Sequence, residues 1–262
     1  MKLIFWKMEQ KELSKNRLKY LQSLKLKKYR LKYGCFLAEG QKVVKELLDD
    51  KKVKIKALYA LSSWYDKDPV IPDNEHIVLF RVSEAELDRI SSLQNSNQVI
   101  AECQMMPPDL PLNLKGWIVY LDGLQDPGNV GTIIRTADWF DCAGVVLRKG
   151  SVDIYNPKTL QAGMGSIGRL PIAYMHAHEL RDHYPGHTWW LATLTGTDVR
   201  QTKFEQPGIL VIGHESSGIS NDFEDFHPRA IALPKLTKRK IDSLNAASAT
   251  SALLAMITLR TS

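Results

Sequence analysis

The sequence predicts an α/β protein built from two domains. Short apolar runs alternate with amphipathic segments along the 262 residues, as in a parallel sheet covered by helices. Three prolines between Pro107 and Pro111 interrupt this pattern, because proline stops helices and disfavours central strands. We therefore predict an N-terminal domain over residues 1–107, a linker over 108–113 and a C-terminal domain over 114–262.

Composition excludes several other classes of protein. A hydrophobic content of 44% is normal for a chain that buries a core, and no apolar run reaches the ~18 residues of a membrane span. The apolar stretch near the start, Leu3–Trp6, is too short for a signal peptide, so we expect a cytoplasmic protein. The cysteines Cys35, Cys103 and Cys142 are far apart and odd in number, which indicates neither a disulfide framework nor a metal site.

Positive charge is concentrated near the N-terminus. Residues 1–56 carry 17 Lys and Arg against 6 Asp and Glu, a net charge of +11. Residues 108–262 carry 15 against 15 and are neutral. A basic segment beside a neutral one favours a polyanionic partner such as nucleic acid. The alternative is a solvated, lysine-rich helix face.

The N-terminal part predicts a small α/β domain. Its helices follow apolar residues at helical spacing, and its strands follow short apolar runs. Ser83 opens one helix, with Glu86 three residues later as a capping box. The predicted helices cover residues 13–26, 41–50 and a segment from 83, and the predicted strands cover 36–38, 55–60 and 77–80.

The C-terminal part predicts a parallel sheet. Ligands of such sheets bind at the carboxyl ends of the strands, so the loops after Leu121, Ala192, Ile212 and Leu233 are the candidate binding loops. The predicted strands cover residues 117–121, 144–147, 170–174, 188–192, 209–212 and 230–233, and the predicted helices cover 129–140 and 243–260.

Two further patterns are interpreted as structural. The segment 163–168 reads G-x-G-x-x-G, but a predicted helix precedes it and a strand follows it. A dinucleotide site needs the opposite order, so we expect small residues at a crowded packing site. His176, His178, His183 and His187 are close in sequence, but the first two lie about 200° apart on a helix. We interpret this segment as a polar surface helix and predict no metal.

Three of the candidate loops carry polar residues at fixed spacing. The first has Asn129, which stands where a helix cap would, and Arg135 six residues later. The second places Glu215 between two glycines at a strand end, and the third reads Ser243-Leu244-Asn245. Taken alone, each has an ordinary interpretation as a cap or a turn.

Together the three loops resemble the signature motifs of the SpoU (TrmH) family of RNA ribose 2′-O-methyltransferases, in the SPOUT superfamily. The motifs are N-x-G-x-x-x-R, G-x-E-x-x-G-[IL] and S-L-N, and the resemblance covers residues 117–257. The earlier segment Phe36–Gly40, with Val43 and Leu47, looks like the small α/β substrate-binding domain, similar to ribosomal protein L30e, that precedes many members. The resemblance implies a C-terminal trefoil knot that holds the cofactor, and a homodimer.

The resemblance also implies an activity. The enzyme would transfer a methyl group from S-adenosyl-L-methionine to a ribose 2′-hydroxyl, in ribosomal RNA first and in transfer RNA as the alternative. A protein of a different class, an inactive RNA-binding or ribosome-assembly protein of the same fold, would have replaced the motif residues. The resemblance implies catalytic roles for Asn129, Arg135, Glu215, Ser243 and Asn245.

By resemblance, Arg135 is placed at the hydroxyl. Because arginine normally stays protonated, we expect it to bind a backbone phosphate and orient the ribose, and its role as a base is left open. Asn129, Ser243 and Asn245 would hold the ribose and Arg135, and Glu215 would anchor the loop or the arginine. The cofactor would meet the backbone near Thr193, Gly213, Leu233 and Leu244.

One loop departs from the family pattern. Leu233-Pro234-Lys235 replaces the usual Ile-Pro-Met, no glycine follows, and Ser243 comes ten residues after Leu233, not eight. The added length includes Lys238, Arg239 and Lys240. We expect these cations either to contact RNA phosphates or to be solvated.

Overall fold

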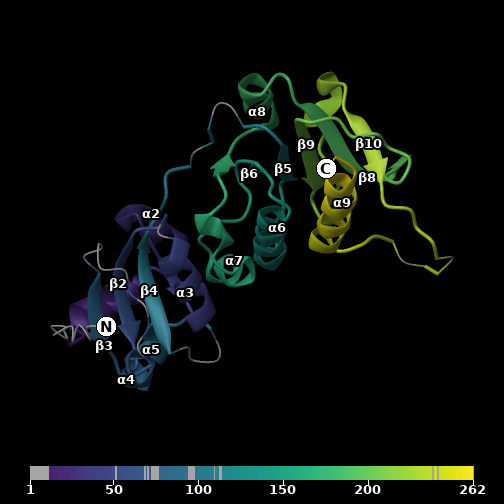
Figure 1. Ribbon diagram of the computed structural model, residues 1–262. Helices are drawn as coiled ribbons and strands as arrows, with labels where there is room; N and C mark the ends of the chain where they lie inside the picture. The colour runs from purple at the N-terminus through teal and green to yellow at the C-terminus, as the bar shows by residue number, and fades with distance from the viewer. Residues whose placement is uncertain are drawn as a thin grey trace, which may run out of the picture. The chain divides into compact units, whose positions relative to one another are not determined.

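The computed structural model (Figure 1) describes residues 12–50, 52–67, 69, 71, 77–93, 98–108, 110–111, 114–237, 239–240 and 242–261. The chain divides into two compact units. Unit 1 contains residues 1–106 and 155–168, and unit 2 contains residues 107–154 and 169–262. The segment 155–168, which the sequence analysis assigned to the C-terminal domain, thus groups with unit 1.

Unit 1 is built on a four-stranded sheet of order β1-β4-β2-β3. Strand β4 runs antiparallel to both β1 and β2, and β2 pairs with β3 in parallel. Strand β4 was not predicted, because Glu102 interrupts its apolar pattern and is nevertheless buried. The strands are β1 (Cys35–Glu39), β2 (Ile55–Ala60), β3 (Val78–Arg81) and β4 (Val99–Gln104).

The helices of unit 1 confirm some predictions and correct one. The capping box of Ser83 and Glu86 is present at the start of α5. The helix predicted over 13–26 is wrong at its end, because α1 stops at Ser23 and α2 follows, capped by Gly34 with a left-handed φ of 60°. The helices are α1 (Lys15–Ser23), α2 (Lys27–Tyr33), α3 (Gln41–Asp50), α4 (Ser62–Tyr65), α5 (Glu84–Ile90), α7 (Pro157–Gly163) and the 3-10 turn η1 (Ser166–Gly168).

The glycines of the G-x-G-x-x-G segment lie at a packing site, as predicted. A helix, α7, precedes this segment and strand β7 follows it. A Cβ added at Gly165 would lie 2.8 Å from the Cβ of Glu46, and one at Gly168 would lie 3.1 Å from a carboxylate oxygen of Asp50. The small residues therefore allow this segment to approach α3 closely.

Unit 2 contains the predicted parallel sheet, of order β10-β8-β9-β5-β6-β7, in which every pair is parallel. From β5 the chain builds one side of the sheet with β6 and then β7. It then crosses to the other side of β5, where β9 pairs with β5, β8 with β9, and β10 with β8. The switch of direction falls between β5 and β9, where such sheets bind ligands. The strands are β5 (Trp117–Asp122), β6 (Gly144–Leu147), β7 (Ile172–Tyr174), β8 (Thr188–Asp198), β9 (Gly208–Gly213) and β10 (Arg229–Ala232).

Helices α6 and α9 lie side by side in unit 2 (Figure 1). The hydroxyls of Thr136 on α6 and Ser251 on α9 are 3.1 Å apart. Helix α6 is almost as predicted, whereas α9 begins three residues later than expected. The helical segments of this unit are α6 (Pro127–Trp139), α8 (Ala177–His183), α9 (Ala246–Thr261) and the 3-10 turn η2 (Asn221–Phe226). Within the described part of the chain, no helix has the length and apolar character to cross a membrane.

Candidate functional site

The candidate site lies at the carboxyl edge of the unit 2 sheet, where the loops after β5 and β9 meet the start of α9. Helix α6 follows β5 directly, and its N-cap is Asp126, whose carboxylate accepts a hydrogen bond of 2.8 Å from the backbone N–H of Asn129. The expectation that Asn129 caps this helix is therefore wrong. Pro127 starts the helix because it lacks the N–H that would otherwise need a partner, and Asn129 stands in the first turn with its side chain released for other contacts.

The side chain of Asn129 joins the other two loops. Its Nδ2 donates to Oε1 of Glu215 at 3.0 Å, and its Oδ1 accepts from Nδ2 of Asn245 at 2.8 Å. One amide thus uses its donor and its acceptor at once. We call Asn129, Glu215 and Asn245 the amide cluster. It brings together three of the five catalytic residues predicted from the sequence.

The third member of the amide cluster also caps the last helix. Oδ1 of Asn245 accepts from the backbone N–H groups of Ala247 at 2.9 Å and Ser248 at 3.2 Å. The predicted start of this helix at Ser243 is wrong because Asn245 takes the capping role. Ser243 lies two residues earlier, exposed to solvent, and the structure does not bring its side chain to the amide cluster.

The carboxylate of Glu215 is held in its charged form. Partial burial alone would raise its pKa, but hydrogen bonds from Asn129 and from the backbone of Glu215, Gln125 and Asp126 outweigh burial and lower the pKa below its ordinary value. The loop after β9 is thereby tied to the loop after β5 by a carboxylate that stays ionised at neutral pH.

The buried carboxylate of Asp122, which was not predicted as a site residue, also connects the loops after β5 and β9. Asp122 ends β5, and its Oδ2 accepts from the backbone N–H of Ser220 at 2.6 Å, while Oδ1 pairs with Arg148 at 3.1 Å. Arg148 also pairs with Asp222 at 3.1 Å. The available signal was an acidic residue directly after the buried run Trp117–Leu121, since a buried charge needs partners.

Arg135 lies on α6, more than one turn beyond Asn129, and is exposed. Within the described part of the chain, its guanidinium makes no hydrogen bond or ion pair. Glu215, expected to anchor the loop or the arginine, bonds to Asn129 of the first loop and not to Arg135. Arg135 therefore presents its guanidinium to solvent, open to an external anion.

The residues predicted to meet a cofactor lie in or after strands and before the last helix. Thr193 was expected in a loop after Ala192, but this is wrong, because β8 continues to Asp198. The hydroxyl oxygen of Thr193 is buried and bonds to no described residue. A Cβ at Gly213 would collide with the backbone of Gly218, so this position needs glycine. Leu233 follows β10 and is half-buried, and Leu244 is 57% exposed. These backbone and apolar groups suit a ligand with a flat apolar part and a polar chain.

An exposed leucine that the sequence analysis did not single out lies in the same region. Leu236, in the loop after β10, is 84% exposed. Arg239 and Lys240, further along that loop, are exposed as well, and Lys238 lies outside the described residues. The loop thus presents apolar and cationic side chains together.

The histidine segment is a surface helix, as predicted, but one detail of its geometry is wrong. His176 is the N-cap of α8 and has an extended backbone, so helical spacing does not apply to it. Its ring stacks on that of His178 with centroids 5.7 Å apart, not on the opposite side. Across the described residues, no three His, Cys, Asp or Glu side chains are grouped as a metal would require.

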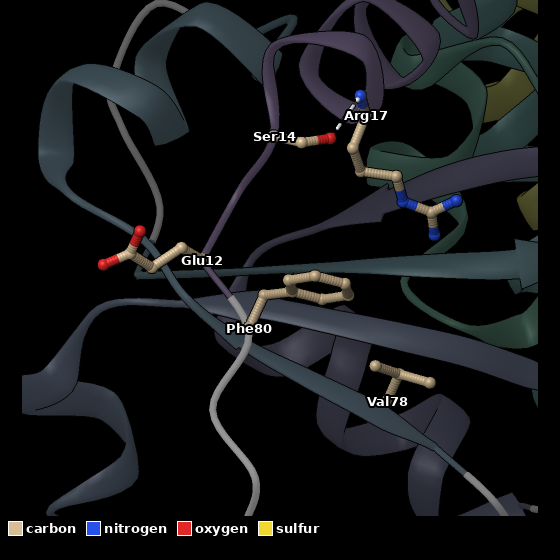
Figure 2. Close-up of a pocket in the computed structure, with 5 residues that line it drawn as sticks. All are labelled: Glu12, Ser14, Arg17, Val78 and Phe80. Atoms are coloured by element: carbon tan, nitrogen blue, oxygen red, sulfur yellow. Dashed lines mark hydrogen bonds between the residues drawn. The ribbon is translucent and has the colours of Figure 1, made fainter.

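A separate hollow lies on unit 1 and contains none of the predicted site residues (Figure 2). Arg17 lines this hollow. Its guanidinium donates to the hydroxyl of Tyr59 at 2.8 Å and pairs with the buried carboxylate of Glu102. The lining residues drawn in Figure 2 are Glu12, Ser14, Arg17, Val78 and Phe80.

Fold and site together define an α/β protein of two units, one of which has a candidate ligand site at the carboxyl edge of its parallel sheet. Residues 116–255 match the SpoU rRNA Methylase family, and residues 15–101 match the MRM3-like substrate binding domain. The chain belongs to the SpoU rRNA methylase family. The sequence-based prediction of the family and of the fold class is confirmed.

Named relatives are similar over most of the chain. The 23S rRNA (guanosine(2553)-2′-O)-methyltransferase RlmP of Bacillus subtilis is 29% identical over 81% of this chain and 85% of its own. An uncharacterized tRNA/rRNA methyltransferase of Synechocystis is 30% identical over 90% and 88%. The AdoMet-bound rRNA methyltransferase of Sinorhizobium meliloti superposes with a TM-score of 0.79 and 27% identity, over 94% of this chain and 97% of that one.

Proposed function

We propose that this protein is an S-adenosyl-L-methionine-dependent methyltransferase that modifies a ribose 2′-hydroxyl in ribosomal RNA. The observation that carries the proposal is the amide cluster, in which Asn129, Glu215 and Asn245 join three separate loops at the sheet edge, with Arg135 exposed on the same helix as Asn129. The relatives named for 2′-O-methylation of 23S rRNA support this activity and favour ribosomal over transfer RNA.

The residues at the strand ends fit the cofactor. The buried hydroxyl of Thr193, which bonds to no described residue, offers a hydrogen bond, and glycine at position 213 lets the loop after β9 close tightly on Gly218. Leu233 and Leu244 supply apolar surface for an adenine ring. When bound, the cofactor supplies an electrophilic methyl group on a sulfonium. The proposal is further supported by the AdoMet-bound rRNA methyltransferase among the structural relatives.

The chain's own residues then have to position a weak nucleophile. The amide cluster fixes the first turns of α6 and α9, so that the side chains near them keep one arrangement. Arg135 binds a phosphate next to the target ribose through two parallel N–H bonds and turns the 2′-hydroxyl toward the methyl group. Ser243, exposed near Asn245 in the sequence, donates a hydrogen bond to the ribose or accepts one from it. Glu215 keeps the cluster charged and ordered.

A trefoil knot and a homodimer belong to the same proposal. The match of residues 116–255 to the SpoU rRNA Methylase family supports the knot that the resemblance implies. Trp139 on α6 and Leu259 on α9 are 84% and 77% exposed, and these two helices pack together. Large exposed apolar side chains on adjacent helices favour burial by a second copy of the chain.

The proposal includes a substrate domain, a linker over residues 108–113 and a cytoplasmic site of action. The match of residues 15–101 to a substrate binding domain supports an RNA role for the first part of the chain. Segment 155–168 packs with that part, so the domain boundary is proposed to be discontinuous. Ribosomal RNA as substrate supports action where ribosomes are assembled.

Two measurements test the activity. Purified protein is incubated with S-adenosylmethionine carrying a labelled methyl group and with ribosomal RNA from cells that lack the gene. Transfer of label to one ribose, mapped as a 2′-O-methyl site that is absent from those cells, is expected. A thermal shift with the cofactor but no transfer to ribosomal or transfer RNA would instead favour an inactive RNA-binding protein.

A further inference from the structure

The first two helices carry an unusual charge distribution. Residues 13–38 contain eight Lys and Arg and no Asp or Glu. Three of these cations are engaged inside unit 1: Arg17 with Glu102, Lys25 with the carbonyl of Ser91 at 2.5 Å, and Arg30 as described below. The other five are exposed and have no hydrogen-bonded or ion-paired partner within the described part of the chain: Lys15, Lys19, Lys27, Lys28 and Lys32.

Aromatic rings accompany these lysines on α2. Tyr29 and Tyr33, one helical turn apart, are stacked with centroids 6.2 Å apart and an interplanar angle of 13°. Tyr20 of α1 meets Tyr33 edge-on, with centroids 5.0 Å apart. Tyr33 is 40% exposed although it is a large apolar ring. The ammonium groups of Lys28 and Lys32 lie over the rings of Tyr29 and Tyr33, at 4.8 and 5.3 Å.

The helix that carries these rings is held in place from its inner side. The buried guanidinium of Arg30 donates to the carbonyls of Leu24 and Lys25, at 2.9 and 2.8 Å, and so fixes the turn between α1 and α2. The hydroxyl of Tyr20 donates to Glu102 at 2.8 Å, and the ring of Tyr20 packs edge-on against that of Tyr33. The rings are therefore preorganised, and a ligand that stacks on them does not have to order them first.

We propose that the face of α2 formed by Lys28, Tyr29, Lys32 and Tyr33 binds unpaired nucleotides of the substrate RNA. This inference rests on the proposed function and names the part of unit 1 that contacts the RNA. An unpaired base stacks on the exposed ring of Tyr33, and the ammonium of Lys32 moves from that ring to the adjoining phosphate. Lys28 neutralises the next phosphate along the strand.

Single-stranded RNA fits this face better than other partners. Aromatic faces interleaved with cations bind unpaired nucleotides, since every base offers a π-face and every nucleotide a phosphate. A paired helix hides its base faces and would use the lysines alone. An acidic protein segment would likewise depend on the charges and would be insensitive to the nature of the ring at Tyr33.

The test uses the full chain and two labelled RNAs of equal length, one a hairpin with an unpaired loop and one a blunt duplex. Tyr33→Ala should weaken loop binding roughly 5- to 100-fold, the usual effect of losing one stacked base, and leave duplex binding unchanged. Tyr33→Phe, which keeps the ring, should bind like the parent. Tyr33→Leu keeps apolar contact with Tyr20 but has no π-face, so it should behave like Tyr33→Ala even if the alanine variant folds poorly.

The lysines are tested by salt dependence. Lys28→Gln with Lys32→Gln should reduce the slope of log affinity against log salt by about 1.4, because each phosphate contact on a single strand contributes about 0.7. The matched control is Lys42→Gln with Lys45→Gln on α3, two exposed lysines next to acidic residues, whose slope should be unchanged. Equal loop affinity for Tyr33→Leu and the parent overturns the inference, as does an unchanged slope for the α2 pair.

Failure of this inference is distinguishable from failure of the proposed function. If the α2 variants bind and methylate RNA like the parent, only the inference is wrong. If the parent binds loop RNA through Tyr33 but methylates no RNA, the inference stands as a binding surface and the proposed activity is wrong. If loop and duplex lose affinity equally in Tyr33→Leu, the face acts as a structural support and the stacking inference is overturned.

Discussion

The side-chain amide of Asn245 donates a hydrogen bond of 2.8 Å to the side-chain oxygen of Asn129, across 116 residues of sequence. The same Asn129 side chain donates to Glu215 at 3.0 Å. The amide accepts from one neighbour with its oxygen and donates to a carboxylate with its nitrogen. The three loops are therefore joined at a single side chain, and a change there acts on all of them.

Asn129→Asp removes the donor and keeps the size of the side chain. Two carboxylates then face each other, and Glu215 loses the hydrogen bond from residue 129, whereas Asn245 can still donate to the new carboxylate. The side-chain link between the loop after β9 and the start of α6 is therefore broken. We expect methyl transfer to fall by about 100-fold, the usual result of misplacing reacting groups by about an ångström. Initial rates with saturating cofactor measure the effect. Asn221→Asp, an exposed position in η2, is the control and should keep the parental rate.

Arg135→Ala is expected to abolish methyl transfer while leaving cofactor affinity within about tenfold, or ~1.4 kcal/mol, of the parent. The reason is that Arg135 is exposed on α6 and is not among the residues expected to meet the cofactor. Arg135→Lys keeps the charge but loses the two parallel N–H bonds, so partial activity is expected. Isothermal titration and a transfer assay separate the two effects. A cofactor affinity reduced well beyond tenfold contradicts the assignment of Arg135 to the RNA.

The sequence predicted the sheet of unit 2 because its buried strands, such as β5 and β9, are continuous apolar runs. It failed where tertiary contacts override local pattern. Glu102 lies inside β4, buried by contacts with Tyr20, Tyr59 and Arg17, and nothing local to that strand indicates such partners. A buried carboxylate satisfied from two other elements cannot be predicted from alternation alone.

The candidate site shows the same division. The types and spacing of Asn129, Glu215 and Asn245 marked them as candidates, and the structure joins these three. The predicted cap residues of α6 and α9 were both wrong. Asp126 and Asn245 cap these helices, and near neighbours of similar capping strength made the choice ambiguous in the sequence. The packing of segment 155–168 with unit 1 depends on long-range contacts and left no local signal.

The pH dependence of stability should change when Glu215 is neutralised. Its pKa is lowered from an ordinary value of 4.5, so the unfolded chain binds a proton more readily than the folded one. The stabilisation is fully present above about pH 4.5 and is lost as pH falls through the lower pKa of the folded state. Melting temperatures of the parent and Glu215→Gln, measured from pH 7 to pH 3, should converge toward the acid end. A constant difference over that range would contradict this assignment.

The loop after β10 is expected to contribute to RNA binding through charge. Replacing Lys238, Arg239 and Lys240 together with Ala should weaken RNA binding and reduce its salt slope, since each phosphate contact releases roughly 0.7 to 0.9 of a counterion. Cofactor affinity should barely change. The slope of log affinity against log salt is compared for the triple variant and the parent. Equal slopes would mean that the loop cations are only solvated.

Removal of residues 1–112 should have two separable effects. RNA affinity should fall strongly, because the truncation removes the basic first helices and with them the α2 face. Segment 155–168 should also lose its packing, since the ring of Tyr155 lies 4.6 Å from that of Phe36 and its hydroxyl accepts from the backbone N–H of Met106 at 2.9 Å. Gly165 and Gly168 would lose their contacts with α3 as well.

Limited proteolysis and RNA titration read out these effects independently. In the full chain, segment 155–168 should resist cleavage, and in the truncated protein it should be cut first, because its buried side chains are then exposed to solvent. The truncated protein should still show a thermal shift with S-adenosylmethionine, since the candidate cofactor residues all lie in unit 2. Resistance of the segment in the truncated protein would mean that it packs equally well within unit 2. An RNA dissociation constant equal to that of the full chain would remove any substrate role from the first unit.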